Sequence, residues 1–189
     1  ADKVDTNVNA ASAGDTTVTL AESRTITKDE YKNGYLFVNS GTGVGEVYRI
    51  KSNTAVSSAT GCVITLDEED GLVSALAASG STEVGLALDP YNDVIVSPTT
   101  VTNITLGATT IALTADYFGW IQTWGWASVL ANAAGVVGEH VRVGGASTAG
   151  GTEDLDRDGS GENEQAVGIQ TNVAPTNADH GLIYLTISP

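Results

Sequence analysis

Short runs in which apolar and polar residues alternate recur along most of the chain. In residues 46–51, Glu46, Tyr48 and Ile50 fall on one side and the intervening residues on the other. Residues 83–88 and 182–187 alternate in the same way. A period of two residues is typical of a β-strand with one buried face. The pattern therefore predicts half-buried strands in these three segments.

Other short runs, bounded by Gly, Pro, Asn or Asp, predict further strands. They cover residues 16–20, 34–39, 62–66, 94–96, 101–106, 110–114, 127–130, 137–143 and 166–173. The run 34–39 is almost continuously apolar, so we expect it to be covered on both faces. About a dozen short strands, with no amphipathic helix longer than two turns, predict an all-β fold, a jelly-roll-like β-sandwich or barrel.

The chain has 189 residues, a length that suits one domain with an added arm. Residues 1–13 are small and polar without sustained periodicity, which predicts an extended N-terminal arm outside the core. Residues 14–189 are predicted to form a single β domain. Within it, residues 144–165 are rich in Gly, Ser, Thr and acids and are interpreted as a loop.

One weak internal similarity is present. Residues 14–20, with the sequence GDTTVTL, resemble residues 107–113, with the sequence GATTIAL. Each of these segments is followed by an acid, a Tyr, and a Gly with an aromatic residue after it, although the spacing differs. The similarity indicates either chance or two related strand–turn–strand units.

All three tryptophans of the chain lie in residues 116–126. A large aromatic side chain buries about 150–250 Å², so this segment is expected to pack the core or an interface between subunits. The residues assigned to this packing are Tyr117, Phe118, Trp120, Trp124 and Trp126. The tryptophans share sequence parity, so on a strand they would line one face, and an exposed aromatic stripe of that kind can stack on sugar rings.

The chain is strongly acidic, with 23 acidic and 8 basic residues and a net charge of −15. Its basic residues are scattered singly, whereas proteins that bind phosphate groups cluster them. This distribution argues against nucleic acid and against an anionic membrane surface as partners. No apolar run approaches the roughly 20 residues of a membrane helix.

The residues show no catalytic constellation. Cys62, the single cysteine, lies in an alternating run and is interpreted as a buried small hydrophobe rather than a reactive thiol. His140 and His180 lie far apart, and no nucleophile-elbow motif or phosphate-binding loop occurs. Acidic residues are plentiful, yet no pair stands out as a glycosidase dyad. We therefore expect the protein not to be an enzyme.

A calcium-loop pattern begins at Asp154. Asp154, Asp156 and Asp158 occupy the first, third and fifth positions and Gly159 the sixth, as in an EF-hand loop. Position twelve is Gln165 instead of the bidentate Glu, and no flanking helices are predicted. Two interpretations follow, a calcium site made by the three aspartates or a solvated acidic loop. Calcium is the one cofactor that the sequence brings into consideration.

Several segments, in their order, resemble the head decoration (capsid cement) proteins of tailed phages. They are DEYKNGYLFVN at 29–39, GEVYRI at 45–50, LDPY at 88–91, DYFGWIQTWG at 116–125, AVG at 166–168 and GLIYLTISP at 181–189. The acidic insert at 150–163 and the Ala-rich start do not belong to this pattern. The resemblance implies a β-rich jelly roll or barrel that assembles as a homotrimer on the outside of the phage head and binds neighbouring major capsid subunits.

We therefore expect a structural virion protein on the outer surface of the head, with the major capsid protein as its partner. The N-terminal residues assigned to capsid contact are Ala1, Asp2, Lys3, Val4 and Asp5. Arms that order on binding can span a seam between partners. The alternatives are a tail-fibre or spike domain, a carbohydrate-binding β module that uses residues 120–126, and a calcium-stabilised cell-surface repeat.

Overall fold

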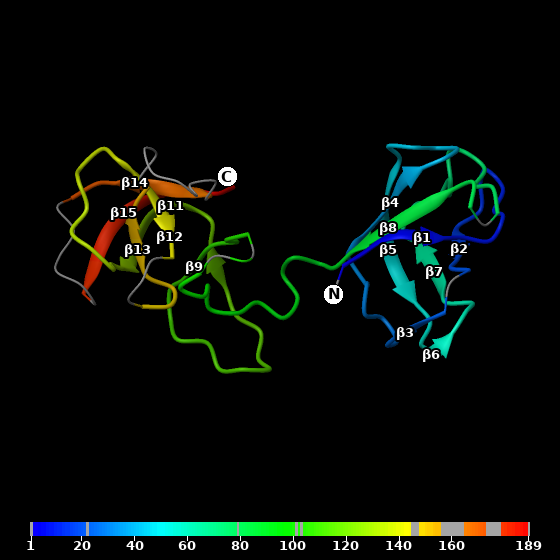
Figure 1. Ribbon diagram of the computed structural model, residues 1–189. Helices are drawn as coiled ribbons and strands as arrows, with labels where there is room; N and C mark the ends of the chain where they lie inside the picture. The colour runs from blue at the N-terminus through cyan, green and yellow to red at the C-terminus, as the bar shows by residue number, and fades with distance from the viewer. Residues whose placement is uncertain are drawn as a thin grey trace. The chain divides into compact units, whose positions relative to one another are not determined.

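The computed structural model describes residues 2–21, 23–78, 80–100, 102, 104–144, 148–155, 165–172 and 179–188. The chain divides into two compact units, Ala1–Asn92 and Asp93–Pro189 (Figure 1). The described residues form antiparallel sheets and no helix, which confirms the all-β prediction. The division at residue 93 differs from the single domain predicted for residues 14–189. It falls where the described residues of the segment 93–107 form no strand.

The first unit contains a six-stranded antiparallel sheet in the order β1-β8-β4-β5-β7-β2. Its strands are β1 (Lys3–Asn7), β2 (Thr17–Thr19), β4 (Tyr35–Ser40), β5 (Val47–Asn53), β7 (Val63–Leu66) and β8 (Glu83–Ala87). An antiparallel bridge between Val8 and Leu20 joins the chain after β1 to the chain after β2. The sheet therefore curls so that its two outermost strands, β1 and β2, come next to each other. A two-stranded sheet pairs β3 (Arg24–Ile26) with β6 (Val56–Ala59).

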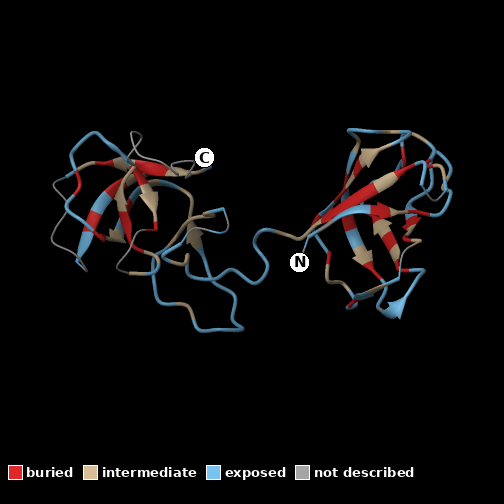
Figure 2. Ribbon diagram, viewed as in Figure 1, coloured by how far each residue is buried: buried red, intermediate tan, exposed pale blue. Residues whose placement is uncertain are grey.

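Alternation along these strands fills the inside of the curled sheet. On β5, Tyr48 and Ile50 are buried while Val47 is exposed, and on β8 Val84 and Leu86 are buried (Figure 2). These burials confirm the faces predicted for residues 46–51 and 83–88. On β4 the sides also alternate, because Tyr35 is exposed, so the prediction that both faces of 34–39 are covered was wrong.

The N-terminal residues belong to the first unit instead of forming an arm. β1 pairs with β8, and Thr6 and Val8 are completely buried. Further on, Ala11 and Leu76 exchange two backbone hydrogen bonds, of 3.0 and 2.8 Å. The sequence-based expectation for residues 1–13 fails because alternate small side chains here cover a core that other strands supply.

The second unit contains a five-stranded antiparallel sheet in the order β11-β15-β14-β12-β13. Its strands are β11 (Trp124–Leu130), β12 (His140–Val143), β13 (Thr152–Asp154), β14 (Ala166–Gln170) and β15 (His180–Thr186). A parallel bridge between Ala131 and Thr152 joins its two outermost strands at one end. A short hairpin pairs β9 (Ala108–Thr109) with β10 (Ile121–Gln122).

The two cores differ in content. The first includes Tyr31 and Tyr48 among many aliphatic side chains. Burial raises the pKa of the Tyr31 hydroxyl to about 12, with a further contribution from nearby Glu30, so it stays neutral at ordinary pH. Among the described residues, the second core consists of Ala127, Val141, Val167, Ile183 and Leu185, with no aromatic residue. Burial of Ile183 and Leu185 confirms the inward face predicted for residues 182–187.

Two further expectations differ from the structure. The described residues of segments 94–96, 101–106 and 110–114, predicted as strands, form none. The predicted loop 144–165 contains β13, because residues 152–154 pair with β12. Thr152 is buried, and its hydroxyl donates to the backbone oxygen of Leu130 at 2.9 Å. In the described part of the chain, no helix is long and apolar enough to cross a membrane.

Asn53 connects the turn at residues 27–34 to β5. Its Oδ1 accepts from the backbone N–H of Tyr31 at 2.8 Å, and its Nδ2 donates to the backbone oxygen of Thr27 at 2.8 Å. We predict that Asn53→Ala lowers the free energy of unfolding of the first unit by about 2–4 kcal/mol, because buried backbone groups lose their partners. Urea unfolding measures the loss, and exposed Asn9→Ala is the control. Equal stability of the two variants would contradict the prediction.

Candidate functional site

The most exposed aromatic residues lie between β9 and β10, in the segment 117–120. Tyr117, Phe118 and Trp120 are 77%, 107% and 88% exposed. A turn at Asp116, which has a positive φ of 65°, precedes them. The loop folds back closely on Leu113, since a Cβ at Gly119 would lie 2.3 Å from the Cδ2 atom of that side chain. These side chains therefore do not pack the core of the single chain.

Trp124 and Trp126 lie on β11 and share one face of the sheet. Both contact the ring of Tyr184 on β15, with ring centroids 5.9 and 5.6 Å apart and interplanar angles of 78° and 88°. Near-perpendicular aromatic pairs of this kind contribute about 0.5–1.5 kcal/mol beyond their buried area. Trp124 is 44% exposed and Trp126 is 61% exposed. The three rings form a group that we call the aromatic platform.

The side chain of Gln122 holds the backbone of β11 next to the platform. The Gln122 Nε2 donates to the backbone oxygens of Trp124 and Trp126, at 2.9 and 2.8 Å. Gly125 lies between the two tryptophans with a φ of +88°, a region that other L-residues rarely adopt. The side chain of Gln122 thus satisfies two carbonyl groups on β11 that face away from β15.

The five predicted packing residues are therefore separated into two exposed groups. Trp124 and Trp126 share a face, as their parity predicts, whereas Trp120 lies outside the strand. Packing of these residues within the chain core is not observed, and their burial between copies stays a prediction. Tyr184 was missed as a member of the group. The alternation at 182–187 places it on the outward face, but only the register of β11 against β15 brings it between the tryptophans.

The aromatic residues lie in an almost uncharged part of the sequence. Between residues 94 and 138, Asp116 is the one charged side chain, although the chain carries a net charge of −15. Charge is thus concentrated elsewhere in the chain. An uncharged aromatic surface favours contact with an apolar or neutral polar partner over a charged one.

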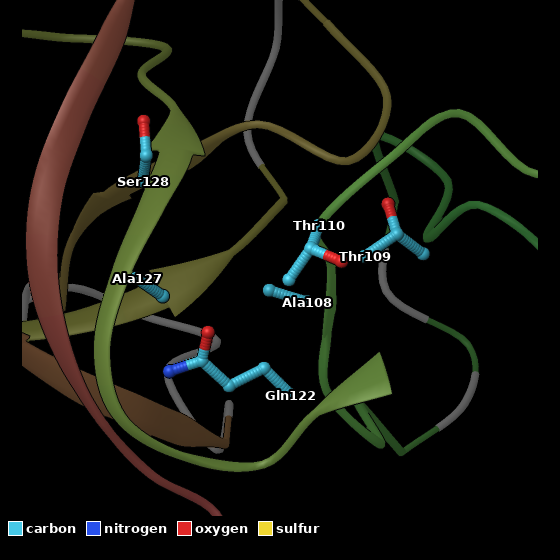
Figure 3. Close-up of a pocket in the computed structure, with 6 residues that line it drawn as sticks. All are labelled: Ala108, Thr109, Thr110, Gln122, Ala127 and Ser128. Carbon is cyan, nitrogen blue, oxygen red and sulfur yellow. The ribbon is translucent and has the colours of Figure 1, made fainter. Parts of the chain in front are cut away.

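A small hollow lies between the β9–β10 hairpin and β11. Its volume is about 140 Å³, and in Figure 3 Ala127 points from β11 toward Ala108 and Thr110. The lining residues are Ala108, Thr109, Thr110, Gln122, Ala127 and Ser128, none of which is charged. Pockets that hold small-molecule ligands usually measure about 300–1,000 Å³. The hollow has room for a few water molecules.

The N-terminal residues assigned to capsid contact lie on the first unit. The Oδ1 of Asp2 accepts from the backbone N–H of Leu88 at 2.9 Å, and Asp5 accepts from the side-chain amide of Asn39. Val4 is 61% exposed. Ala1 and the side chain of Lys3 lie outside the described residues. Val4 is thus the one apolar side chain of this group that the structure shows open to contact.

Of the proposed calcium ligands, the structure describes Asp154 alone. Its Oδ2 accepts from the backbone N–H of Val136 at 2.9 Å, and its Oδ1 is buried with no hydrogen-bond partner among the described residues. Asp156 and Asp158 lie outside the described residues. Within the described ranges, no group of three or more His, Cys, Asp or Glu residues is placed to hold a metal ion. The calcium interpretation therefore stays a hypothesis.

The other residues considered for chemistry, Cys62, His140 and His180, lie in different parts of the fold. Cys62 is 1% exposed, its thiol contacts the backbone oxygen of Thr54 at 3.2 Å, and burial raises its pKa. The interpretation as a buried hydrophobe is confirmed. His140 and His180 are both exposed, on β12 and at the start of β15.

The carboxylate of Glu46 belongs to a hydrogen-bond network that holds parts of the first unit together. Glu46 accepts from the Ser74 hydroxyl at 2.6 Å and from the Tyr48 hydroxyl, and Tyr48 in turn accepts from the backbone N–H of Val73 at 2.9 Å. The bond from Ser74, followed by that from Tyr48, lowers the pKa of Glu46. Burial and the neighbouring carboxylate raise the pKa of Tyr48. The network attaches the crossover around residues 72–76 to β5.

Comparison with protein-family models, with curated proteins and with solved structures finds no match for this chain. A functional assignment therefore rests on the geometry of the chain and on the order of its sequence motifs.

The Glu46 network predicts a loss of stability in acid. The folded-state pKa of Glu46 lies below its ordinary value of 4.5, so the carboxylate stabilises the fold above that pH and its contribution is lost as the pH falls through the folded value. We expect Glu46→Gln to be less stable than the natural chain near neutral pH, with the difference shrinking in acid. Urea midpoints between about pH 7 and pH 3 measure this.

The matched control is Glu68→Gln, which alters an exposed turn residue of the same unit. A difference between Glu46→Gln and the natural chain that is constant over this pH range would contradict the prediction.

Proposed function

We propose that the chain is a structural virion protein that decorates the outer surface of a tailed-phage head. Copies associate as trimers and bind neighbouring major capsid subunits, without catalysing a reaction. The observation that carries the proposal is the exposed segment 117–120, whose three aromatic side chains are left largely uncovered by the described residues. The order of the motifs that resemble decoration proteins supports the same function.

The size of the exposed segment fits a contact between copies. Tyr117, Phe118 and Trp120 are nearly fully exposed and would bury roughly 500 Å² on association. A standard interface buries about 800 Å² on each partner, so these residues would supply more than half of it. Ile111, at 69% exposure, adds to the apolar area of this part of the chain. Exposed patches of several hundred Å² usually mark interaction sites.

The charge distribution also favours this segment as the place where copies meet. Two copies that each carry a net charge of −15 repel one another over most of their surfaces. Repulsion is weakest where charged side chains are fewest, and residues 94–138 contain only Asp116. An interface there lets strongly acidic copies associate while their charged surfaces remain in water.

The proposal includes a jelly-roll-like or barrel architecture, which the resemblance implies. The curled six-stranded antiparallel sheet of the first unit supports it. The tail-fibre or spike hypothesis and the cell-surface repeat hypothesis have no specific observation in their favour.

The contact with the capsid is placed at the N-terminal residues of the first unit. Val4 presents an exposed apolar side chain on β1. Deletion of residues 1–13 would remove β1 from the sheet, so it would confuse a loss of folding with a loss of binding. Single substitutions on the exposed face of β1 avoid this problem.

We predict that the double variant Phe118→Ser with Trp120→Ser sediments as a monomer, whereas the natural chain sediments as a trimer. Removing two large exposed side chains takes away most of the apolar area that holds the copies together. Analytical ultracentrifugation measures the mass, with Tyr91→Ser as the control, since Tyr91 is 58% exposed on the first unit. A natural chain that is monomeric at all concentrations would refute the trimer.

We further predict that Val4→Asp weakens binding to empty phage heads by about tenfold or more, because it places a charge in an apolar contact. Cosedimentation with heads that lack the decoration protein measures the bound fraction. The control is Val47→Asp, because Val47 is 60% exposed on β5 of the same unit. If the natural chain does not cosediment with heads at all, the decoration function is wrong.

A further inference from the structure

The outer face of the five-stranded sheet carries a continuous row of side chains across four strands. Trp126 lies opposite Tyr184, Tyr184 opposite Ile169, and Ile169 opposite His140. The neighbours of these residues along the strands, such as Ala127 and Ile183, are buried. Because successive side chains of a strand point to opposite faces, the row lies on the outside of the sheet.

The aromatic part of this row is held in a fixed arrangement. Tyr184 makes near-perpendicular contacts with both Trp124 and Trp126, and Gln122 holds the two tryptophan carbonyls from the strand edge. Rings that are already ordered lose little conformational entropy when a ligand covers them. The platform is thus preorganised for a ligand.

The platform is small for a protein interface. Trp124 and Trp126 expose about half of their surfaces, which corresponds to roughly 250 Å² for the pair. A stable interface between proteins needs about 800 Å² from each partner. The area instead matches a ligand of two or three rings. The separate segment 117–120, with its larger exposure, suits a contact between copies better.

The chemistry around the rings is that of an uncharged polar ligand. Hydroxyl-bearing residues are interspersed with the rings in the strand register, with Thr186 opposite Trp124 and Ser128 two residues after Trp126. The Tyr184 hydroxyl makes no hydrogen bond to any described residue. Arg142, on β12 of the same sheet, is paired with Glu153 of β13. A pyranose ring presents C–H groups on its face and hydroxyls on its rim, and therefore complements such a surface.

We infer that the platform of Trp124, Trp126 and Tyr184 binds a neutral glycan, whose sugar rings stack on the indoles and whose hydroxyls bond to the polar groups at the edge. This is a binding activity in addition to capsid decoration. It does not depend on the capsid proposal, since it uses residues on a different part of the chain from Val4 and from the segment 117–120.

Isothermal titration calorimetry of the full chain with maltohexaose, cellohexaose and laminarihexaose tests the inference, with an acidic oligogalacturonate as the charged comparison. We expect at least one neutral hexasaccharide to bind and the acidic one not to bind. Trp126→Ala should weaken that binding by about tenfold or more, and Trp120→Ala by less than about twofold. Circular dichroism and thermal unfolding establish that each variant is folded.

Two milder variants keep the test decisive if Trp126→Ala does not fold. Tyr184→Phe keeps the ring contacts and removes only the hydroxyl, so binding should weaken by a few-fold. Gly125→Ala keeps all three rings, and its Cβ would meet nothing closer than the Gln122 Nε2 at 3.8 Å, but the positive φ becomes strained. We expect it to weaken glycan binding by shifting one indole relative to the other.

Absence of binding by all three neutral hexasaccharides at about 10 mM would overturn the inference. Equal weakening by Trp120→Ala and Trp126→Ala would do the same. If Trp126→Ala dissociates the oligomer and no sugar binds, the platform is an interface between copies and the inference is wrong. Binding to empty heads is measured separately, so its loss would refute the decoration function and leave the glycan result standing.

Discussion

The structure depends on the curling of each main sheet, by which its two outermost strands approach each other. In the first unit the bridge between Val8 and Leu20 joins the two ends of a six-stranded sheet, and in the second Ala131 and Thr152 do so at one end. Unpaired strand edges leave polar backbone groups exposed and invite association with other chains. Curling also creates an interior, so that alternate side chains on every strand face one another. Short strands with small apolar residues are then sufficient to form a core.

The same constraint explains why the aromatic residues lie outside. The core of the second unit is formed by Ala127, Val141, Val167, Ile183 and Leu185, with a hollow of only about 140 Å³ beside Ala127. An indole on the inward face of β11 would need space that these packed side chains already occupy. Trp124 and Trp126 instead take the outward positions of β11, where Tyr184 packs between them. The aromatic residues therefore contribute to surfaces more than to the core.

The division of the aromatic residues into a loop segment and a strand platform gives the second unit two surfaces with different properties. The segment 117–120 is nearly fully exposed and follows a turn, so it can adapt to a large partner. The platform is half-exposed and fixed on a sheet, so it is better suited to a small rigid ligand. The segment 117–120 and the two tryptophans of the platform lie within a stretch of the sequence that is almost free of charge, while the remainder of the chain is acidic. One acidic chain can thus self-associate and still keep an independent binding face.

The sequence alone determined the fold class and the buried faces of the strongly alternating strands, because a period of two specifies which side chains share a face whatever they pack against. Tyr48, Ile50, Val84 and Ile183 are buried as that period requires. Tertiary structure decided whether a face is covered at all. Thr6 and Val8 became core residues because β8 and Leu20 lie beside them, and the apolar residues 94–96 remained outside a sheet because no strand pairs with them. The platform depends in the same way on strand register, since Tyr184 lies far from Trp126 in sequence and meets it only through the pairing of β15 with β11.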